Sequence, residues 1–211
     1  MRTRRKLVYV PILHTTSDMG SMAGPMKEAY IQRFGEKKWL EHIMVIGEMW
    51  IGLAREVEGL HLPYKKLKIY QDGLPVCGKE REIVEDLARQ GSPNHRLLYL
   101  MMRRGATVVG TEDAKLLLEE YSYLKRIAET KTHREKERLR LEYEKKAPSL
   151  LKKRDNKIAE RILSTLKEGE AGILFIGLLH HVDEFLTSKL DISYLIHRLP
   201  FRRSFEMEMA V

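Results

Sequence analysis

The chain has 211 residues, of which 43% are hydrophobic and 32% are charged, and its formal net charge is +8. The hydrophobic share supports a buried core of ordinary size, so we expect a single α/β domain over residues 1–211. The only cysteine, Cys77, excludes an intrachain disulfide framework and a cysteine-based zinc site. No apolar run approaches the ~18 residues of a membrane-spanning helix, so we predict a soluble, cytoplasmic protein that does not enter a membrane.

The charged and amide residues of the chain allow predictions about its binding partners and its source organism. The net positive charge allows an acidic partner without requiring one. Lysine, arginine and glutamate are abundant, whereas asparagine and glutamine are sparse. This bias favours a thermophilic source, although the 10 methionines argue mildly against it.

Short apolar strands alternate with helices along the chain. Strands are predicted where β-branched and apolar residues run together, at 6–13, 66–70, 106–109, 173–179 and 191–199. Helices are predicted from apolar periodicity and end signals, at 25–34, 35–59, 79–89, 93–104, from 114 onward, and at 155–167. The apolar stripe of the second helix is formed by Leu40, Ile43, Met44, Gly47, Trp50, Ile51 and Ala54. The alternation predicts a central parallel or mixed sheet flanked by helices, whose strand order the sequence does not give.

Residues 131–147 carry charges of both signs and few apolar side chains. We predict a solvated helical extension or hairpin that ends at Pro148, after which Asp155 caps the helix that runs to Lys167. The extension could pair with a second subunit in a homo-oligomer, or its basic residues could touch nucleic acid. Its acidic residues and its lack of interleaved aromatics favour a solvated face over nucleic-acid binding.

Four of the predicted strands end in a residue that can bind a metal or transfer a proton. These residues are His14, Asp72, Glu112 and His180, and His181 is adjacent to the last of them. Because the carboxyl ends of parallel strands meet at one edge of a sheet, we expect these side chains to converge. Imidazoles and carboxylates together suit a divalent ion such as manganese, cobalt or zinc. They equally suit acid–base chemistry without a metal.

Arg154 is predicted to lie just before a helix start, where it could supply a fixed cation for an anionic substrate or a developing oxyanion. Each candidate also has a structural interpretation. Asp72 belongs to an Asp-Gly turn pair, and Glu112 could compensate a helix dipole. His180 and His181 could begin a solvated helix. No phosphate-binding P-loop, dinucleotide fingerprint or G-x-S-x-G nucleophile elbow is found in the sequence.

The motifs resemble those of the superfamily that contains TraB and PrgY, the TIKI proteins, the erythromycin esterases and the haem-binding ChaN proteins. Members carry a G-x-x-H-like motif after the first strand and a second G-x-x-H after a late strand. They also carry an acidic residue after a middle strand and an arginine before a late helix. Here GLLH, ending at His180, matches the late motif, and RDNKIAERI, beginning at Arg154, matches the arginine motif. PILH, ending at His14, matches the first motif without its glycine, and the acidic position is Asp72 or Glu112.

The resemblance implies a metal-dependent hydrolase of peptide, ester or amide bonds that acts on a small-molecule or peptide substrate. His14 and His180, with His181 beside them, would be metal ligands or acid–base groups. Asp72 or Glu112 would be a ligand or general base, and Arg154 would stabilise the oxyanion. The alternatives are a protein that binds haem or a small anion without turnover, and a basic protein associated with nucleic acid.

Overall fold

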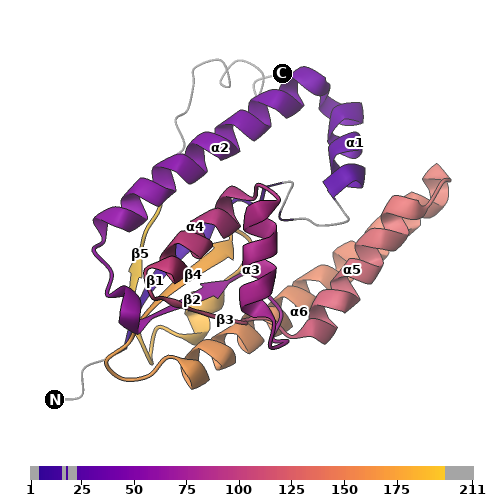
Figure 1. Cartoon of the computed structure of the whole chain (residues 1–211). Coiled ribbons are helices and arrows are strands. Elements are labelled where there is room, and N and C mark those ends of the chain that lie inside the picture. Colours follow the sequence, from indigo (N-terminus) through magenta and orange to yellow (C-terminus); the bar gives the residue numbers. More distant parts are fainter. Residues whose placement is uncertain (1–4, 16–17, 19–22, 198–211) are drawn as a thin grey trace.

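Five parallel strands form the centre of the protein, and helices cover both faces of this sheet (Figure 1). The computed structural model describes residues 5–15, 18 and 23–197. The order of the strands is β3-β2-β4-β1-β5. Their bounds are β1 (Lys6–Ile12), β2 (Leu67–Gln71), β3 (Thr107–Val109), β4 (Ala171–Gly177) and β5 (Asp191–Tyr194). The predicted α/β fold is confirmed, and the sheet is parallel throughout. The end of the predicted last strand, 198–199, lies outside the described residues.

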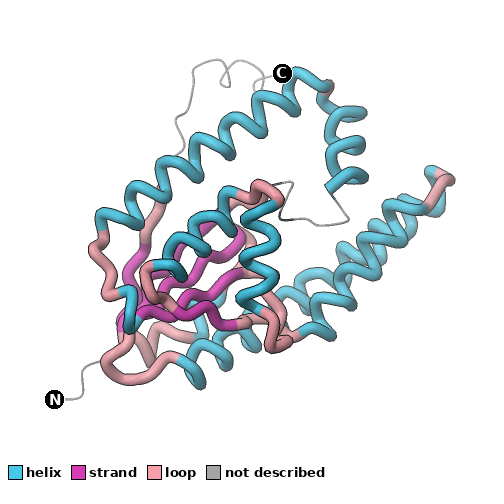
Figure 2. Tube along the Cα trace, in the orientation of Figure 1, coloured by secondary structure: helices cyan, strands magenta, loops and turns pink. Residues whose placement is uncertain are grey.

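The helices divide between the two faces of the sheet (Figure 2). Their bounds are α1 (Ala23–Phe34), α2 (Glu36–Gly59), α3 (Glu80–Arg89), α4 (Pro93–Arg103), α5 (Ala114–Glu129) and α6 (His133–Thr165), with short 3-10 helices η2 (Tyr64–Lys66) and η3 (Val182–Phe185). Side chains of α2, α3 and α4 pack on one face, and side chains of α6 and η3 pack on the other. Within the described part of the chain, no helix has an apolar stretch long enough to cross a membrane.

The apolar run of β4 is explained by its central position in the sheet. Ile173 and Phe175 point to the face covered by α2 and α4, whereas Leu174 and Ile176 point to the face covered by α6. All of these side chains are fully buried. Strands buried on both faces are apolar without alternation, which is the pattern of this segment.

The connections of β1 and β4 leave the sheet on opposite faces. From β1 the chain runs through α2 to β2, and from β4 it runs through η3 to β5 on the other face. These two strands are hydrogen-bonded neighbours. In open α/β sheets, ligands bind outside the carboxyl ends of the strands at such a switch point. The topology therefore places a crevice beside the residues that follow β1 and β4.

Pro11 stands in β1 although that strand lies inside the sheet. The carbonyl oxygen of Tyr9 accepts from the backbone N–H of Leu195, on the side of β5. Pro11, two residues later, faces the same side, where β5 has already ended at Tyr194. The missing N–H therefore costs no hydrogen bond of the sheet.

The predicted end of the extension at Pro148 is wrong. Helix α6 runs without a break from His133 to Thr165, and Pro148 lies exposed inside it. An interior proline removes one helical hydrogen bond, at a cost of roughly 3 kcal/mol. The helix continues because Leu150, Ile158 and Ile162 are fully buried beyond the proline. Figure 1 shows α5 and the first half of α6 side by side, projecting from the body.

Two further predictions about α6 are corrected with the helix boundary. Arg154 and Asp155 were expected at a helix start, as a flanking cation and a cap. Both lie in the interior of α6, and both side chains are buried. Because they are neighbours on a helix that packs against the sheet, they reach its carboxyl edge from one side.

The core face of α2 differs from its predicted apolar stripe. The buried residues are Trp39, Ile46, Met49, Trp50, Leu53 and Val57. Most of the predicted stripe, including Leu40, Met44 and Ile51, is exposed. Helix α2 carries apolar residues on two faces, and periodicity alone cannot tell which face meets the sheet.

Replacing leucine by alanine should therefore lower the free energy of unfolding much more on the buried face of α2 than on its exposed face. Leu53 is 1% exposed, and Leu53→Ala should lower the free energy of unfolding by about 2–5 kcal/mol because it leaves a cavity. Leu40 is 56% exposed, and Leu40→Ala should change it by less than about 0.5 kcal/mol. Urea unfolding of both variants measures the difference, and similar losses would show that the Leu40 face is buried in solution.

Candidate metal centre and active site

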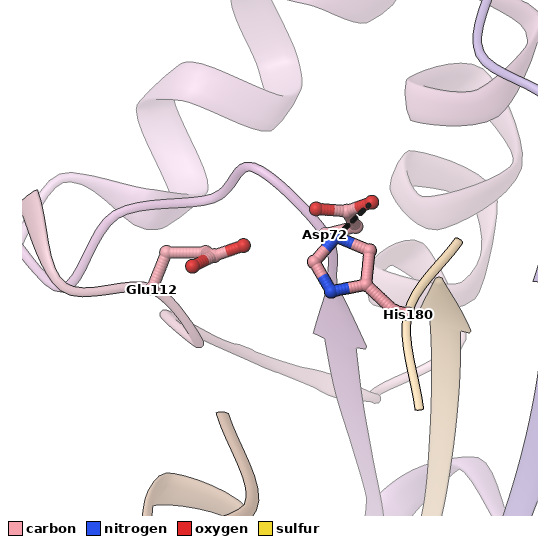
Figure 3. A group of neighbouring side chains, drawn as sticks. All are labelled: Asp72, Glu112 and His180. Atoms are coloured by element: carbon pink, nitrogen blue, oxygen red, sulfur yellow. Dashed lines mark ion pairs between the residues drawn. The ribbon is translucent and has the colours of Figure 1, made fainter. Parts of the chain in front are cut away.

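The predicted strand-end residues converge at the carboxyl edge of the sheet. His14 follows β1, Asp72 follows β2, Glu112 follows β3 and His180 follows β4. One ligand atom from each of Asp72, Glu112 and His180 lies within 4.8 Å of the others, and all three residues are buried. Figure 3 shows these three side chains turned toward one another.

Asp72 is the centre of the contacts. Its Oδ2 accepts from His14 Nε2 at 3.0 Å and from the backbone N–H of Gly177 at 3.0 Å. His180 Nε2 lies 3.4 Å from the same oxygen. The other carboxylate oxygen of Asp72, Oδ1, accepts from Nη2 of Arg154 at 3.0 Å. Asp72 thus joins His14, His180 and Arg154.

Arg154 connects Asp72 and Glu112, which the sequence left as alternatives for the acidic position. Its Nη2 donates to Glu112 Oε1 at 2.6 Å and to Asp72, and its Nε donates to Glu112 Oε2 at 3.2 Å. Its Nη1 donates to Glu120 at 2.5 Å. The structure brings Asp72 and Glu112 together rather than selecting one of them.

Asp155 orients His180 from α6. Its Oδ1 accepts from His180 Nδ1 at 2.5 Å, and its Oδ2 accepts from the backbone N–H of His181. A carboxylate behind an imidazole fixes the tautomer that presents Nε2, as in many metal sites. The side chain of His181 is exposed and is not part of the metal-capable group, so only its backbone supports the site.

The contact between His180 and Asp72 requires a cation. Because Nδ1 of His180 donates to Asp155, the neutral ring presents a lone pair at Nε2. That lone pair would face the carboxylate oxygen of Asp72 at 3.4 Å. Either a second proton on the ring or a metal ion between the two atoms resolves this repulsion. The donor set therefore fits a divalent ion.

The charge balance of the buried group also favours additional positive charge at this site. With neutral histidines, Asp72, Glu112, Glu120 and Asp155 are opposed only by Arg154 within this network. Buried charges are tolerated when they are paired or when they coordinate a metal. The excess of carboxylates favours protonated histidines or a bound cation.

The environment separates the pKa values of the two central carboxyl groups. Burial alone would raise the pKa of Asp72, but the His14 hydrogen bond and the charges of His180, His14 and Arg154 hold it well below its usual range. Burial raises the pKa of Glu112, and the Arg154 hydrogen bonds offset this only in part. Pairs of carboxyl groups separated in this way are typical of acid and base roles.

Both histidines are biased toward their charged form. Burial lowers the pKa of His14, but its hydrogen bond to Asp72 and the negative charges of Asp72 and Asp18 together outweigh burial, so the net shift is upward. For His180, burial is outweighed by the hydrogen bond to Asp155 and by the charge of Asp72, and its pKa is also raised. Each imidazole therefore holds a proton more strongly than a free histidine does.

Gly177 allows the close approach of Asp72 and His14. A Cβ atom at this position would lie 2.9 Å from Asp72 Oδ2 and 3.1 Å from His14 Nε2. This contact explains why position 177 is occupied by glycine. The requirement is steric, because Gly177 is not among the residues with positive φ.

Gly177→Ala should displace Asp72 and destabilise the protein by about 1–3 kcal/mol through overpacking. Gly47→Ala is the matched control, because no atom lies within 4 Å of its added Cβ in α2. That change should stabilise by about 0.5–1 kcal/mol, as alanine does in helices. Thermal and urea unfolding test the pair, and a neutral Gly177→Ala would contradict the tight contact.

A cavity of about 220 Å³ adjoins this group. It is lined by His14, Asp18, Gln71, Asp72, Gly73, Leu74, Ile83, Leu87, His95 and Arg154. Asp18, Gln71, His95 and Glu120 belong to this region, but the sequence motifs do not predict them. No spacing signal could have found these residues, because they are brought together from separate elements.

Comparison with protein-family models, with curated proteins and with solved structures found no match for this chain. The chemistry of the site is therefore the basis for its function.

Proposed function

We propose that this protein is a metal-dependent hydrolase of peptide, ester or amide bonds, as the resemblance to the TraB and TIKI group implies. The observation that carries the proposal is the buried group of Asp72, Glu112 and His180, with ligand atoms within 4.8 Å of one another. A divalent ion held there would polarise a carbonyl group and lower the pKa of a bound water. Manganese, cobalt and zinc suit this mixture of carboxylate and imidazole.

His14 fits the role of a general base. Its Nε2–H is held by Asp72, and within the described residues Nδ1 has no hydrogen-bond partner. An imidazole held by a carboxylate on one nitrogen can take a proton on the other, as in hydrolytic triads. The side chain is about one-third exposed and lines the cavity, so a substrate or water can reach it.

Arg154 fits the role of an oxyanion stabiliser that is held rigidly. Its contacts with Asp72, Glu112 and Glu120 leave one N–H of Nη1 without a described partner. The residue also lines the cavity. A fixed donor of this kind needs no reorganisation when negative charge develops on a substrate oxygen.

The alternatives have weaker support. The cavity is smaller than the ~300–1,000 Å³ pockets that enclose drug-sized ligands, which argues against haem. A small anion would meet Arg154 with one N–H left without a described partner, and it would lie beside the three carboxylates that this arginine binds. On the extension, Arg138 pairs with Glu135 and Lys146 pairs with Glu119, as a solvated face would, rather than a nucleic-acid interface.

The test is metal analysis of the protein purified without a histidine tag, followed by titration of the metal-free protein with manganese, cobalt and zinc. We expect one ion per chain and a rise in melting temperature with that ion. Hydrolysis of p-nitrophenyl acetate and of L-leucine p-nitroanilide should depend on the ion and be lost in His14→Gln. The metal-dependent mechanism would be wrong if the protein bound no ion, or if its melting temperature did not change when each ion was added. A Soret band on haem titration, lost in His180→Ala, would support the haem alternative instead.

A further inference from the structure

Helix α2 carries an apolar stripe on its solvent side that the described part of the chain leaves uncovered. Leu40, Met44 and Ile51 are 56%, 59% and 58% exposed, and Ile43 beside them is also exposed. Figure 1 shows α2 along the outside of the molecule, on the side away from α5 and α6. Exposed apolar patches that run together in this way mark interaction sites. The stripe takes no part in the proposed hydrolase chemistry.

The stripe has the spacing of a seam between two helices. Its residues follow one another at alternating intervals of four and three positions, and they are Leu40, Met44, Gly47, Ile51 and Ala54. This alternation is the a/d pattern of a coiled coil, in which side chains of one helix enter gaps on a second helix. Gly47 leaves such a gap, because no atom lies within 4 Å of a Cβ added there. The surface therefore fits a partner helix.

The charges beside the stripe fit a second copy of α2 in one orientation. Glu41 and Arg55 occupy equivalent heptad positions, and neither forms an ion pair with a described residue. When two copies of α2 pack antiparallel, Glu41 of each copy faces Arg55 of the other. A parallel pair would instead place Glu36 against Glu41, and an antiparallel pair shifted by one heptad would place Glu41 against Glu48. Charge complementarity thus selects one orientation and one register.

The same register sets large side chains against small ones. Ile51 of one copy lies opposite Gly47 of the other, and Met44 lies opposite Ala54, and a two-fold axis repeats both contacts. One like-charge contact remains, between the two copies of Glu48 at the axis. Glu48 already interacts within its own chain, so this contact does not bring two unpaired charges together.

We propose that the protein forms a homodimer in which α2 of two copies packs antiparallel, with Ile51 of each copy over Gly47 of the other. No residue of the metal-capable group belongs to α2, so each copy keeps its own site. The proposal therefore does not depend on the hydrolase function. The charged extension, which the sequence suggested as a pairing surface, takes no part in this dimer.

Sedimentation velocity of the full chain over a range of concentrations tests the dimer. The measured mass should rise from 24.7 kDa toward twice that value as the concentration increases. Ile51→Lys and Met44→Lys each place two charges in the apolar seam, and each should raise the dissociation constant of the dimer at least about tenfold. Leu141→Lys is the matched control, because Leu141 is similarly exposed, at 50%, but lies on the extension.

A charge swap tests the orientation and the register. Glu41→Arg alone and Arg55→Glu alone should each weaken dimerisation about fivefold or more at low ionic strength, where surface charges are least screened. The double variant should restore dimerisation, because each pair forms again with its signs exchanged. A double variant that dimerises no better than the single ones would overturn the antiparallel register.

A mass of 24.7 kDa at every concentration would overturn the proposal as a whole. If the melting temperature of that monomer also fell in Ile51→Lys, residues of this chain outside the described ranges would cover the stripe instead. A dimer that Leu141→Lys breaks and Ile51→Lys leaves intact would place the interface on the extension, and it would overturn the proposal in the same way.

Discussion

Replacing Arg154 by leucine is expected to lower the free energy of unfolding by about 3–5 kcal/mol at neutral pH, because it leaves buried carboxylates without their cation. Asp72 and Glu112 are almost completely shielded from solvent, and Arg154 is their shared partner. Urea unfolding at neutral pH measures the loss. The matched control is Arg138→Leu in the same helix, where an exposed pair with Glu135 is removed and no measurable change is expected.

The destabilisation in Arg154→Leu should depend on pH. Burial already raises the pKa of Glu112, and without Arg154 it will rise further. A carboxyl group whose folded pKa is raised contributes stability below its unfolded pKa of about 4.3 and loses it as pH rises through the folded value. The variant should therefore recover part of its stability toward acidic pH, relative to the wild type. A loss of equal size at pH 5 and pH 8 would show that packing, not charge, is the cause.

Replacing His180 by glutamine is expected to abolish binding of manganese, cobalt or zinc, because it removes the only imidazole of the metal-capable group. Asp155→Asn should weaken binding by about 10–100-fold, since the carboxylate behind a ligand histidine sets its orientation and basicity. His181→Gln should leave the affinity unchanged, because that side chain is exposed. Titration calorimetry of the metal-free proteins gives the three affinities.

The order of these effects distinguishes a metal centre from a network of ion pairs. In a metal centre, His180→Gln loses the ion while His181→Gln keeps it, and Asp155→Asn lies between them. In a network without metal, all three proteins would bind the ions equally weakly. The adjacent histidines make this comparison direct, because the two substitutions are identical in chemistry and differ only in burial.

The strands and their polar ends were predictable for a simple reason. Runs such as Ile173–Ile176 are apolar at every position, and only a strand buried on both faces uses such a run in an alternating α/β chain. Once the strands are parallel, His14, Asp72, Glu112 and His180 must share one edge. The glycine of the late motif also has a local explanation, because any side chain at Gly177 would collide with Asp72.

The site residues that α6 provides could not be predicted from local sequence patterns. Local propensity predicts a break at Pro148, whereas burial of the residues after it holds the helix together. The break misplaced Arg154 and Asp155 at a helix start, so the role of Asp155 behind His180 was missed. The core face of α2 was likewise undetermined, because both of its faces carry apolar side chains.

The α/β class, the approximate strand positions and the residues at the strand ends follow from sequence patterns that span a few residues. The strand order, the joining of Asp72 and Glu112 through Arg154, and the cavity formed by Gln71, His95 and Asp18 depend on how distant segments pack. These contacts join residues that are far apart along the chain. Arg154 meets Asp72 across 82 positions, and His95 meets Asp18 across 77, so packing alone brings them into contact.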